Sequence, residues 1–100
     1  MEAIISIIGN AILSKDEYQN YVIDFGVLAL SSKAEVYLQY SKDISNPNLQ
    51  STCGCATSEE NKIEYLNTHQ YGEFVKTIEL TYVAEKKNKT EYIKIKGKCQ

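Results

Sequence analysis

The fold class of this chain is decided by residues 76–96, which read KTIELTYVAEKKNKTEYIKIK. Every second position is apolar on either side of a lysine-rich centre: Ile78, Leu80, Tyr82 and Ala84 precede it, and Ile93 and Ile95 follow it. A period of two is typical of a strand with one buried face, and the polar run between is typical of a turn. The stretch therefore predicts a β-hairpin. The lysines between the apolar positions of its last strand predict that this strand lies at a sheet edge, where charge deters association.

A second hairpin is predicted upstream of the first. Residues 21–30 are apolar at both odd and even positions, which is typical of a strand buried on both faces. Asp24 interrupts them, and a carboxylate there needs a partner or a place near the end of the sheet. Residues 35–41 alternate in polarity, and the short polar run Ser31-Ser32-Lys33 would turn the chain between the two strands.

The amino-terminal and central segments are less regular. The apolar positions in residues 4–13 are mostly isoleucine, which favours one kinked strand or two short strands over the alternative of a short helix. Residues 42–61 hold the only proline among Ser, Asn, Thr and Gln, and predict an irregular connection. We therefore expect a single, mainly β domain over residues 1–100: an antiparallel β-sandwich, or a strongly bent sheet, of six or seven short strands.

The charges of the chain are unevenly distributed. Residues 1–85 carry twelve carboxylates against five lysines, whereas residues 86–100 carry six lysines against Glu91 alone. All eleven basic residues are lysines, and a chain without arginine lacks the side chain best suited to bidentate recognition of phosphate or guanine. An acidic body attracts a basic partner. We expect a protein partner and no nucleic acid.

The sequence also predicts a cytoplasmic location. The apolar amino-terminal run is interrupted by Ser6, Gly9 and Asn10, and Glu2 stands where an export signal would carry a basic residue. No apolar stretch approaches the ~20 residues that a membrane span needs. Three cysteines, an odd number, do not form the paired framework of a small secreted domain.

Four residues could carry metal or thiol chemistry: Cys53, Cys55, His69 and Cys99. Four soft ligands suit a structural zinc ion, but one residue between Cys53 and Cys55 is closer than the usual spacing of zinc ligands. His69 is the only histidine, so thiol catalysis at Cys53 or Cys55 would need it alongside. Cys99 is the penultimate residue and is expected to be frayed. We expect no metal, no cofactor and no enzymatic site.

Eight tyrosines in an acidic chain without catalytic motifs favour a protein-binding module. In size, β-rich pattern, acidic body and lack of arginine, the chain resembles the small immunity proteins of bacterial contact-dependent growth inhibition systems. The resemblance implies a role in neutralising a cognate toxin, such as a basic ribonuclease, by covering its active site with an acidic surface. The polar loops then supply the contacts, and the candidate residues are Asp16, Glu17, Tyr18, Glu59 and Glu60.

Other functions remain open from the sequence. One is an inhibitor carried by a phage or mobile element, which would use the same physics against a different partner. Another is a small metal-binding or thiol domain built on Cys53, Cys55 and His69. A third is a structural role in which exposed strand edges pair. When free of its partner, the chain is expected to be a monomer or a weak dimer.

Overall fold

The computed structural model describes residues 4–51, 56–59, 61–66 and 71–100. These residues form nine strands and no helix. The strands are β1 (Ile5–Ile8), β2 (Ile12–Lys15), β3 (Tyr21–Leu28), β4 (Lys33–Tyr40), β5 (Ser45–Ser51), β6 (Ala56–Glu59), β7 (Lys62–Leu66), β8 (Gly72–Ala84) and β9 (Lys87–Cys99). The predicted mainly β fold is confirmed, with more strands than the six or seven expected.

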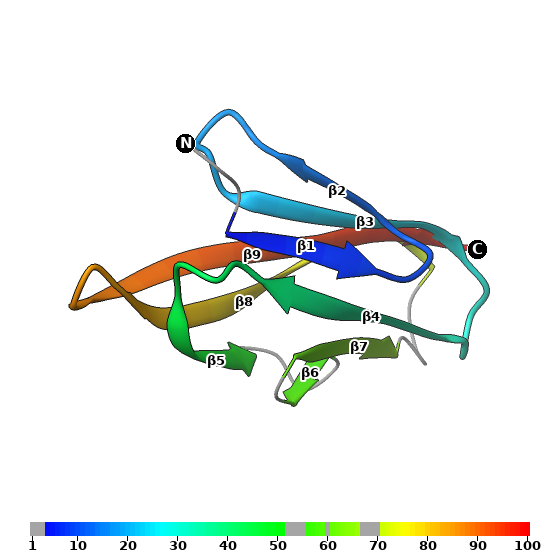
Figure 1. Ribbon diagram of the computed structural model, residues 1–100. Coiled ribbons are helices and arrows are strands. Elements are labelled where there is room, and N and C mark those ends of the chain that lie inside the picture. The colour runs from blue at the N-terminus through cyan, green and yellow to red at the C-terminus, as the bar shows by residue number, and fades with distance from the viewer. Residues whose placement is uncertain (1–3, 52–55, 60, 67–70) are drawn as a thin grey trace.

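The strands form two sheets that pack face to face as two layers (Figure 1). One sheet has the order β1-β4-β7-β6, and the other has the order β2-β3-β9-β8-β5. All neighbouring pairs are antiparallel except β3 and β9, which are parallel. The core between the sheets is contributed by both, with Val36 and Ile63 from one sheet and Ile23, Ile78 and Ile95 from the other fully buried.

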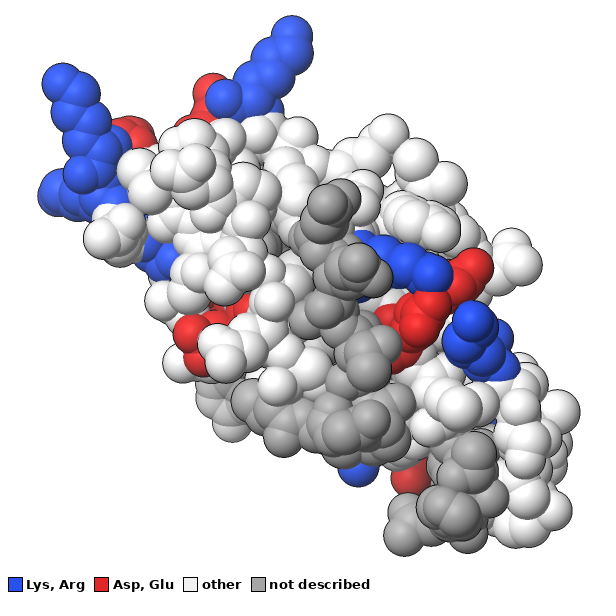
Figure 2. Space-filling view, turned by 90° about the horizontal axis from the view of Figure 1, so that it is seen from below, with Lys and Arg blue, Asp and Glu red and all other residues white. Residues whose placement is uncertain are grey.

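The predicted β8–β9 hairpin is confirmed, and its two strands extend beyond residues 76–96, where the alternating pattern was found. The two strands pair from Gly72↔Cys99 to Ala84↔Lys87, which leaves Glu85 and Lys86 as a two-residue turn. Both turn residues have positive φ, 53° and 64°, as a type I′ hairpin turn requires. Figure 1 shows this turn at one end of the molecule, and Figure 2 shows lysine side chains projecting at that end.

The expectation that the last strand lies at a sheet edge was wrong. β9 is the middle strand of its sheet, with β3 on one side and β8 on the other. Its lysines alternate with Ile93 and Ile95, which are fully buried, so the lysines line the outer face of the sheet instead of protecting an edge.

The predicted hairpin between residues 21–30 and 35–41 was also wrong, although both strands exist. β3 and β4 belong to different sheets, so the turn at Ser31-Ser32 carries the chain from one layer to the other. Tyr21, Val22 and Ile23 are buried in succession, as the two-sided apolar pattern predicted, but Val27 is 65% exposed, so the second half of the strand is not buried on both faces. The neighbours of β3 are β2 and β9, and residues 21–24 lie beside residues 93–96 of β9.

The amino-terminal segment forms strands, as preferred over a helix. Gly9 has a φ of 146° between β1 and β2, and β1 joins one sheet while β2 joins the other. The segment 42–61 is more regular than expected. It contributes β5 and β6, one strand at an edge of each sheet. Pro47 is tolerated in β5 because an edge strand can lack one ladder donor.

Candidate functional site

The outer face of the five-stranded sheet carries the most unusual surface in the described part of the chain. One row of side chains crosses four strands in register: Ile12 of β2, Asp24 of β3, Lys96 of β9 and Val75 of β8. The row is apolar at both ends and has an ion pair in its middle, between Lys96 Nζ and an Asp24 carboxylate oxygen 4.0 Å away. A purely solvated sheet face would carry polar side chains throughout.

Exposed apolar side chains gather on this face, which we call the β9 face. Nine large apolar side chains of the described residues are exposed, and five of them belong to it: Tyr18 (74% exposed), Ile12 (71%), Val27 (65%), Val75 (60%) and Tyr92 (48%). Single exposed apolar residues need no explanation, but a group on one face is typical of a contact surface. Tyrosine at such a surface also offers a hydroxyl.

The lysines of the β9 face are each set beside a carboxylate. Lys94 Nζ lies 2.9 Å from Asp16 Oδ2, and Lys96 Nζ contacts Asp24. Lys98 is directly opposite Glu73 in the β8–β9 register. Lys94 and Lys96 are therefore paired with carboxylates within the protein, and Lys98 has a carboxylate opposite it on the neighbouring strand.

Residues 16–20 form a loop at one end of this face, and Asp16 holds it in shape. Asp16 Oδ1 accepts hydrogen bonds from the backbone N–H groups of Tyr18 and Asn20, both at 2.9 Å. Gln19 has a φ of 67°, which completes the tight turn. The Asp16 carboxylate thus organises its own loop and ties that loop to β9 through Lys94.

The electrostatics of Asp16 follow from these contacts. The Lys94 ammonium, the backbone N–H groups of Asn20 and Tyr18, and the Asn20 side-chain amide all favour the ionised carboxylate. They lower the pKa of Asp16 from its ordinary 3.8 to about 2, against the opposing effect of partial burial. The Asp16 carboxylate is therefore ionised at neutral pH, and its charged form holds the loop through these contacts.

The same loop displays two side chains to solvent. Tyr18 is the most exposed large apolar side chain of the described residues, and its ring centroid lies 6.0 Å from Lys94 Nζ. Glu17 is exposed beside it. The backbone of the loop is already held by these hydrogen bonds. Binding of a partner to Glu17 and Tyr18 would therefore cost little entropy for ordering the loop.

Carboxylates outnumber lysines across the β9 face and its loop. The carboxylates are Asp16, Glu17, Asp24, Glu73 and Glu79, and the lysines are Lys94, Lys96 and Lys98. Glu79 is opposite Tyr92 in the register and so shares the face. The surface combines exposed apolar side chains with a modest negative balance.

The predicted partner-binding residues divide into two groups. Asp16, Glu17 and Tyr18 lie together on the loop beside β9, although Asp16 is occupied by internal hydrogen bonds while Glu17 and Tyr18 are presented outward. Glu59 is in β6, its side chain lies outside the described residues, and Glu60 lies outside them altogether. Whether these two carboxylates approach the loop stays a prediction.

The sequence-based reasoning missed most of the β9 face. Ile12, Val27, Val75 and Tyr92 were not among the predicted protein contacts. The available signal was apolar residues at the outward positions of β8 and β9, where Val75, Val83 and Tyr92 stand among polar side chains.

The candidate metal and thiol residues Cys53, Cys55 and His69 lie outside the described residues. Cys99 was expected to be frayed, and this was wrong. It is the last residue of β9, pairs in register with Leu28 and Gly72, is 2% exposed, and its thiol is free. Within the described ranges, no three His, Cys, Asp or Glu side chains lie close enough together to hold a metal ion.

The opposite outer face, on the four-stranded sheet, has a different character. Lys62 bridges Glu35, at 3.2 Å, and Glu64, and Lys33 also reaches Glu64 at 3.7 Å. These contacts raise the pKa of Lys62 and lower the pKa of Glu64, in each case chiefly through their mutual hydrogen bond. The network of ion pairs makes this face more charged than the β9 face, and three exposed apolar side chains, Ile8, Tyr37 and Leu66, lie on it as well.

Comparison with known proteins adds no relative. No family model matches the chain, and no curated protein or solved structure matches it significantly. The described part of the chain contains no helix with the length and hydrophobicity needed to cross a bilayer.

Proposed function

We propose that this chain acts by binding another protein, and that the β9 face with the loop 16–20 is its contact surface. The observation that carries the proposal is the gathering of Ile12, Tyr18, Val27, Val75 and Tyr92 on one outer sheet face. Burying exposed apolar side chains is the main favourable term in protein association. Tyrosines at the centre of an interface are frequent hot spots.

The charges of the same face support a basic partner. Glu17 and Glu79 leave a negative balance after Lys94, Lys96 and Lys98 have been set against Asp16, Asp24 and Glu73. Such a balance speeds the encounter with a positively charged surface and disfavours nucleic acid. Ionic strength should therefore slow association more than it speeds dissociation.

The specific form that we propose is toxin neutralisation in the cytoplasm. A nuclease toxin has a basic substrate-binding surface, and an acidic, tyrosine-bearing face could cover it as an immunity protein does. The chain would need no cofactor and no catalytic group for this role. It would act stoichiometrically, as a monomer or weak dimer before it meets its partner.

The test is co-expression of the tagged chain with the product of the gene adjacent to its own. The expected result is a stoichiometric complex in which a toxic or nuclease activity of the partner is suppressed. If the neighbouring product neither binds nor harms cells, the toxin-neutralising form of the proposal fails.

A matched pair of variants locates the surface. Ile12→Lys places a charge on the β9 face, and Ile8→Lys makes the same change on the opposite outer face, also in a short edge strand. Ile8 is 54% exposed, so neither variant should disturb the core. Ile12→Lys should weaken the complex by about tenfold or more, as at an interface hot spot, and Ile8→Lys should leave affinity unchanged. Equal effects, or the reverse order, would place the contact elsewhere.

A further inference from the structure

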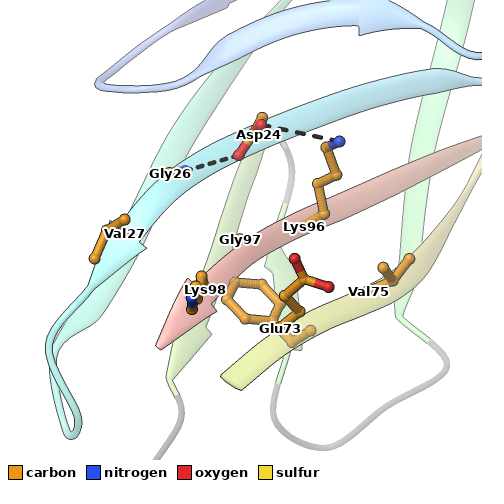
Figure 3. A pocket seen from close by; sticks show the side chains of 9 residues that line it. Asp24, Gly26, Val27, Glu73, Val75, Lys96, Gly97 and Lys98 are labelled. Carbon is orange, nitrogen blue, oxygen red and sulfur yellow. Dashed lines mark hydrogen bonds and ion pairs between the residues drawn. The ribbon is translucent and has the colours of Figure 1, made fainter. Parts of the chain in front are cut away.

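A bulge in β3 opens a pocket within the β9 face. The register with β9 slips between Asp24 and Val27, so β3 carries one residue more than its partner there. Gly26 sits in the bulge with a φ of 74°, and its N–H donates to Asp24 Oδ1 at 2.8 Å. A Cβ atom at position 26 would meet no atom within 4 Å. The resulting cavity has a volume of about 400 Å³ (Figure 3).

Two features define the chemistry of this cavity. Its apolar lining comes from Val27 on β3 and from Phe74 and Val75 on β8. Val27 and Val75 flank the β9 backbone at Gly97 (Figure 3). Its charged groups are balanced: the carboxylates of Asp24 and Glu73 accompany the ammonium groups of Lys96 and Lys98. Neither a cation nor an anion would enter without meeting a like charge.

We propose that this pocket receives an aromatic side chain of the partner protein, which lies over the Gly26 and Gly97 backbone between Val27 and Val75. The inference rests on the proposed function and names the anchor residue of that interface. An aromatic ring is negative on its face and positive at its edge. Lys96 or Lys98 can approach the face, while Asp24 or Glu73 meets the edge or accepts a tyrosine hydroxyl proton.

The balance of charge decides between this occupant and a basic side chain. An arginine would form ion pairs with Asp24 and Glu73. It would first have to displace Lys96, whose Nζ lies 4.0 Å from an Asp24 carboxylate oxygen. It would then leave two ammonium groups beside a third cation. A neutral ring requires no such displacement and uses both signs of charge together with the apolar walls.

The pocket can be tested without a partner by titrating the chain with N-acetyl-L-tyrosinamide and following the amide and methyl NMR signals. We expect saturable shifts at Gly26, Gly97, Val27 and Val75, with a dissociation constant on the order of millimolar. N-acetyl-L-argininamide and N-acetyl-L-leucinamide should bind at least several-fold more weakly. Stronger binding of the arginine probe, or shifts that do not concentrate at these four residues, would overturn the inference.

A variant and its control complete the test. Val75→Asp should abolish the tyrosinamide shifts, whereas Val83→Asp, on the same face of β8 eight residues further along, should preserve them. Val75 is exposed, so its replacement should fold, and circular dichroism checks this. Probe binding that survives Val75→Asp would contradict the assigned pocket.

The two proposals fail separately. If a protein partner is lost with Ile12→Lys but retained at full affinity with Val75→Asp, the β9 face is the interface and the anchor pocket is wrong. If tyrosinamide fills the pocket in the wild type but no protein binds the face, the pocket stands and the proposed function fails.

Discussion

Asp16 is the residue on which the candidate surface depends most. It was chosen from the sequence as a partner contact, but its carboxylate is directed inward to its own loop and to Lys94. Its contribution is to hold Glu17 and Tyr18 in place. A short polar side chain that accepts backbone N–H bonds two and four residues ahead is a local arrangement, whereas the link to Lys94 spans 78 residues and has no local signature.

The stabilising effect of Asp16 should depend on pH. Its pKa is lowered to about 2 in the folded chain, so its contribution is complete above about pH 4 and is lost as pH falls towards 2. Asp16→Asn should therefore lower the urea midpoint at pH 7, and the difference from wild type should shrink between pH 4 and 2. In a Lys94→Met background the same substitution should have a smaller effect. A difference that is independent of pH would contradict this account.

Gly97 is required because three elements meet at its backbone. A Cβ there would lie 2.8 Å from the Gly26 carbonyl oxygen and 2.8 Å from Phe74 Cζ. Phe74 is paired with Gly97 in the register, and its ring stacks on Tyr65 of the other sheet with centroids 3.9 Å apart. The ring thus fills the space that a side chain at position 97 would need.

Gly97→Ala should lower the free energy of unfolding by about 1–3 kcal/mol through overpacking. Combining it with Phe74→Leu should cost less than the sum of the two single changes, because the smaller side chain makes room for the new methyl group. Urea denaturation followed by circular dichroism measures all three variants. Additive costs would show that the ring is not the obstacle.

At the scale of elements, the β8–β9 turn is a strained connection. Glu85 and Lys86 both occupy the left-handed region, which costs an ordinary L-residue about 1–2 kcal/mol. Asparagine and glycine are the residues that a type I′ turn favours. The long hairpin keeps its register because thirteen residue pairs and a buried apolar face hold it beyond the turn.

Replacing this turn should stabilise the fold. The double variant Glu85→Asn with Lys86→Gly should raise the free energy of unfolding by about 1–2 kcal/mol. The double variant Glu85→Gln with Lys86→Gln removes the same charges without changing the backbone preference, and it should have little effect. If both double variants stabilise equally, charge repulsion at the tip is the cause and backbone strain is not.

The elements that could be predicted from sequence are those with a local pattern. Alternating apolar and polar residues predicted the strands β4, β8 and β9, and a continuous apolar run predicted β3. The pairing of β3 with β9 could not be predicted. The two strands lie about seventy residues apart in the sequence, and parallel strands are not joined by a hairpin turn that a sequence pattern could reveal. β5 was missed because an edge strand can be polar on most positions, and only Leu49 of its residues is buried.

At the scale of the whole molecule, the parallel β3–β9 pair produces the surface. It places the amino-terminal loop 16–20 beside the carboxyl-terminal strand, and so brings Tyr18 next to Lys94 and Ile12 into one row with Val75. The loop residues were chosen as candidates from the sequence because polar loops are common contact sites. The apolar half of the candidate surface could not be recognised from the sequence, because its members come from four strands whose order the sequence does not encode locally.

The most direct test of the β9 face is to label lysines with an N-hydroxysuccinimide ester, with and without the bound partner, and to quantify each position by mass spectrometry. Lysines are present on both outer faces, and the chain contains no arginine. We expect Lys94, Lys96 and Lys98 to lose reactivity several-fold in the complex, while Lys33 and Lys62 on the other sheet keep theirs. Protection of Lys33 and Lys62 with unchanged labelling along β9 would show that the partner binds the opposite face and would contradict the account.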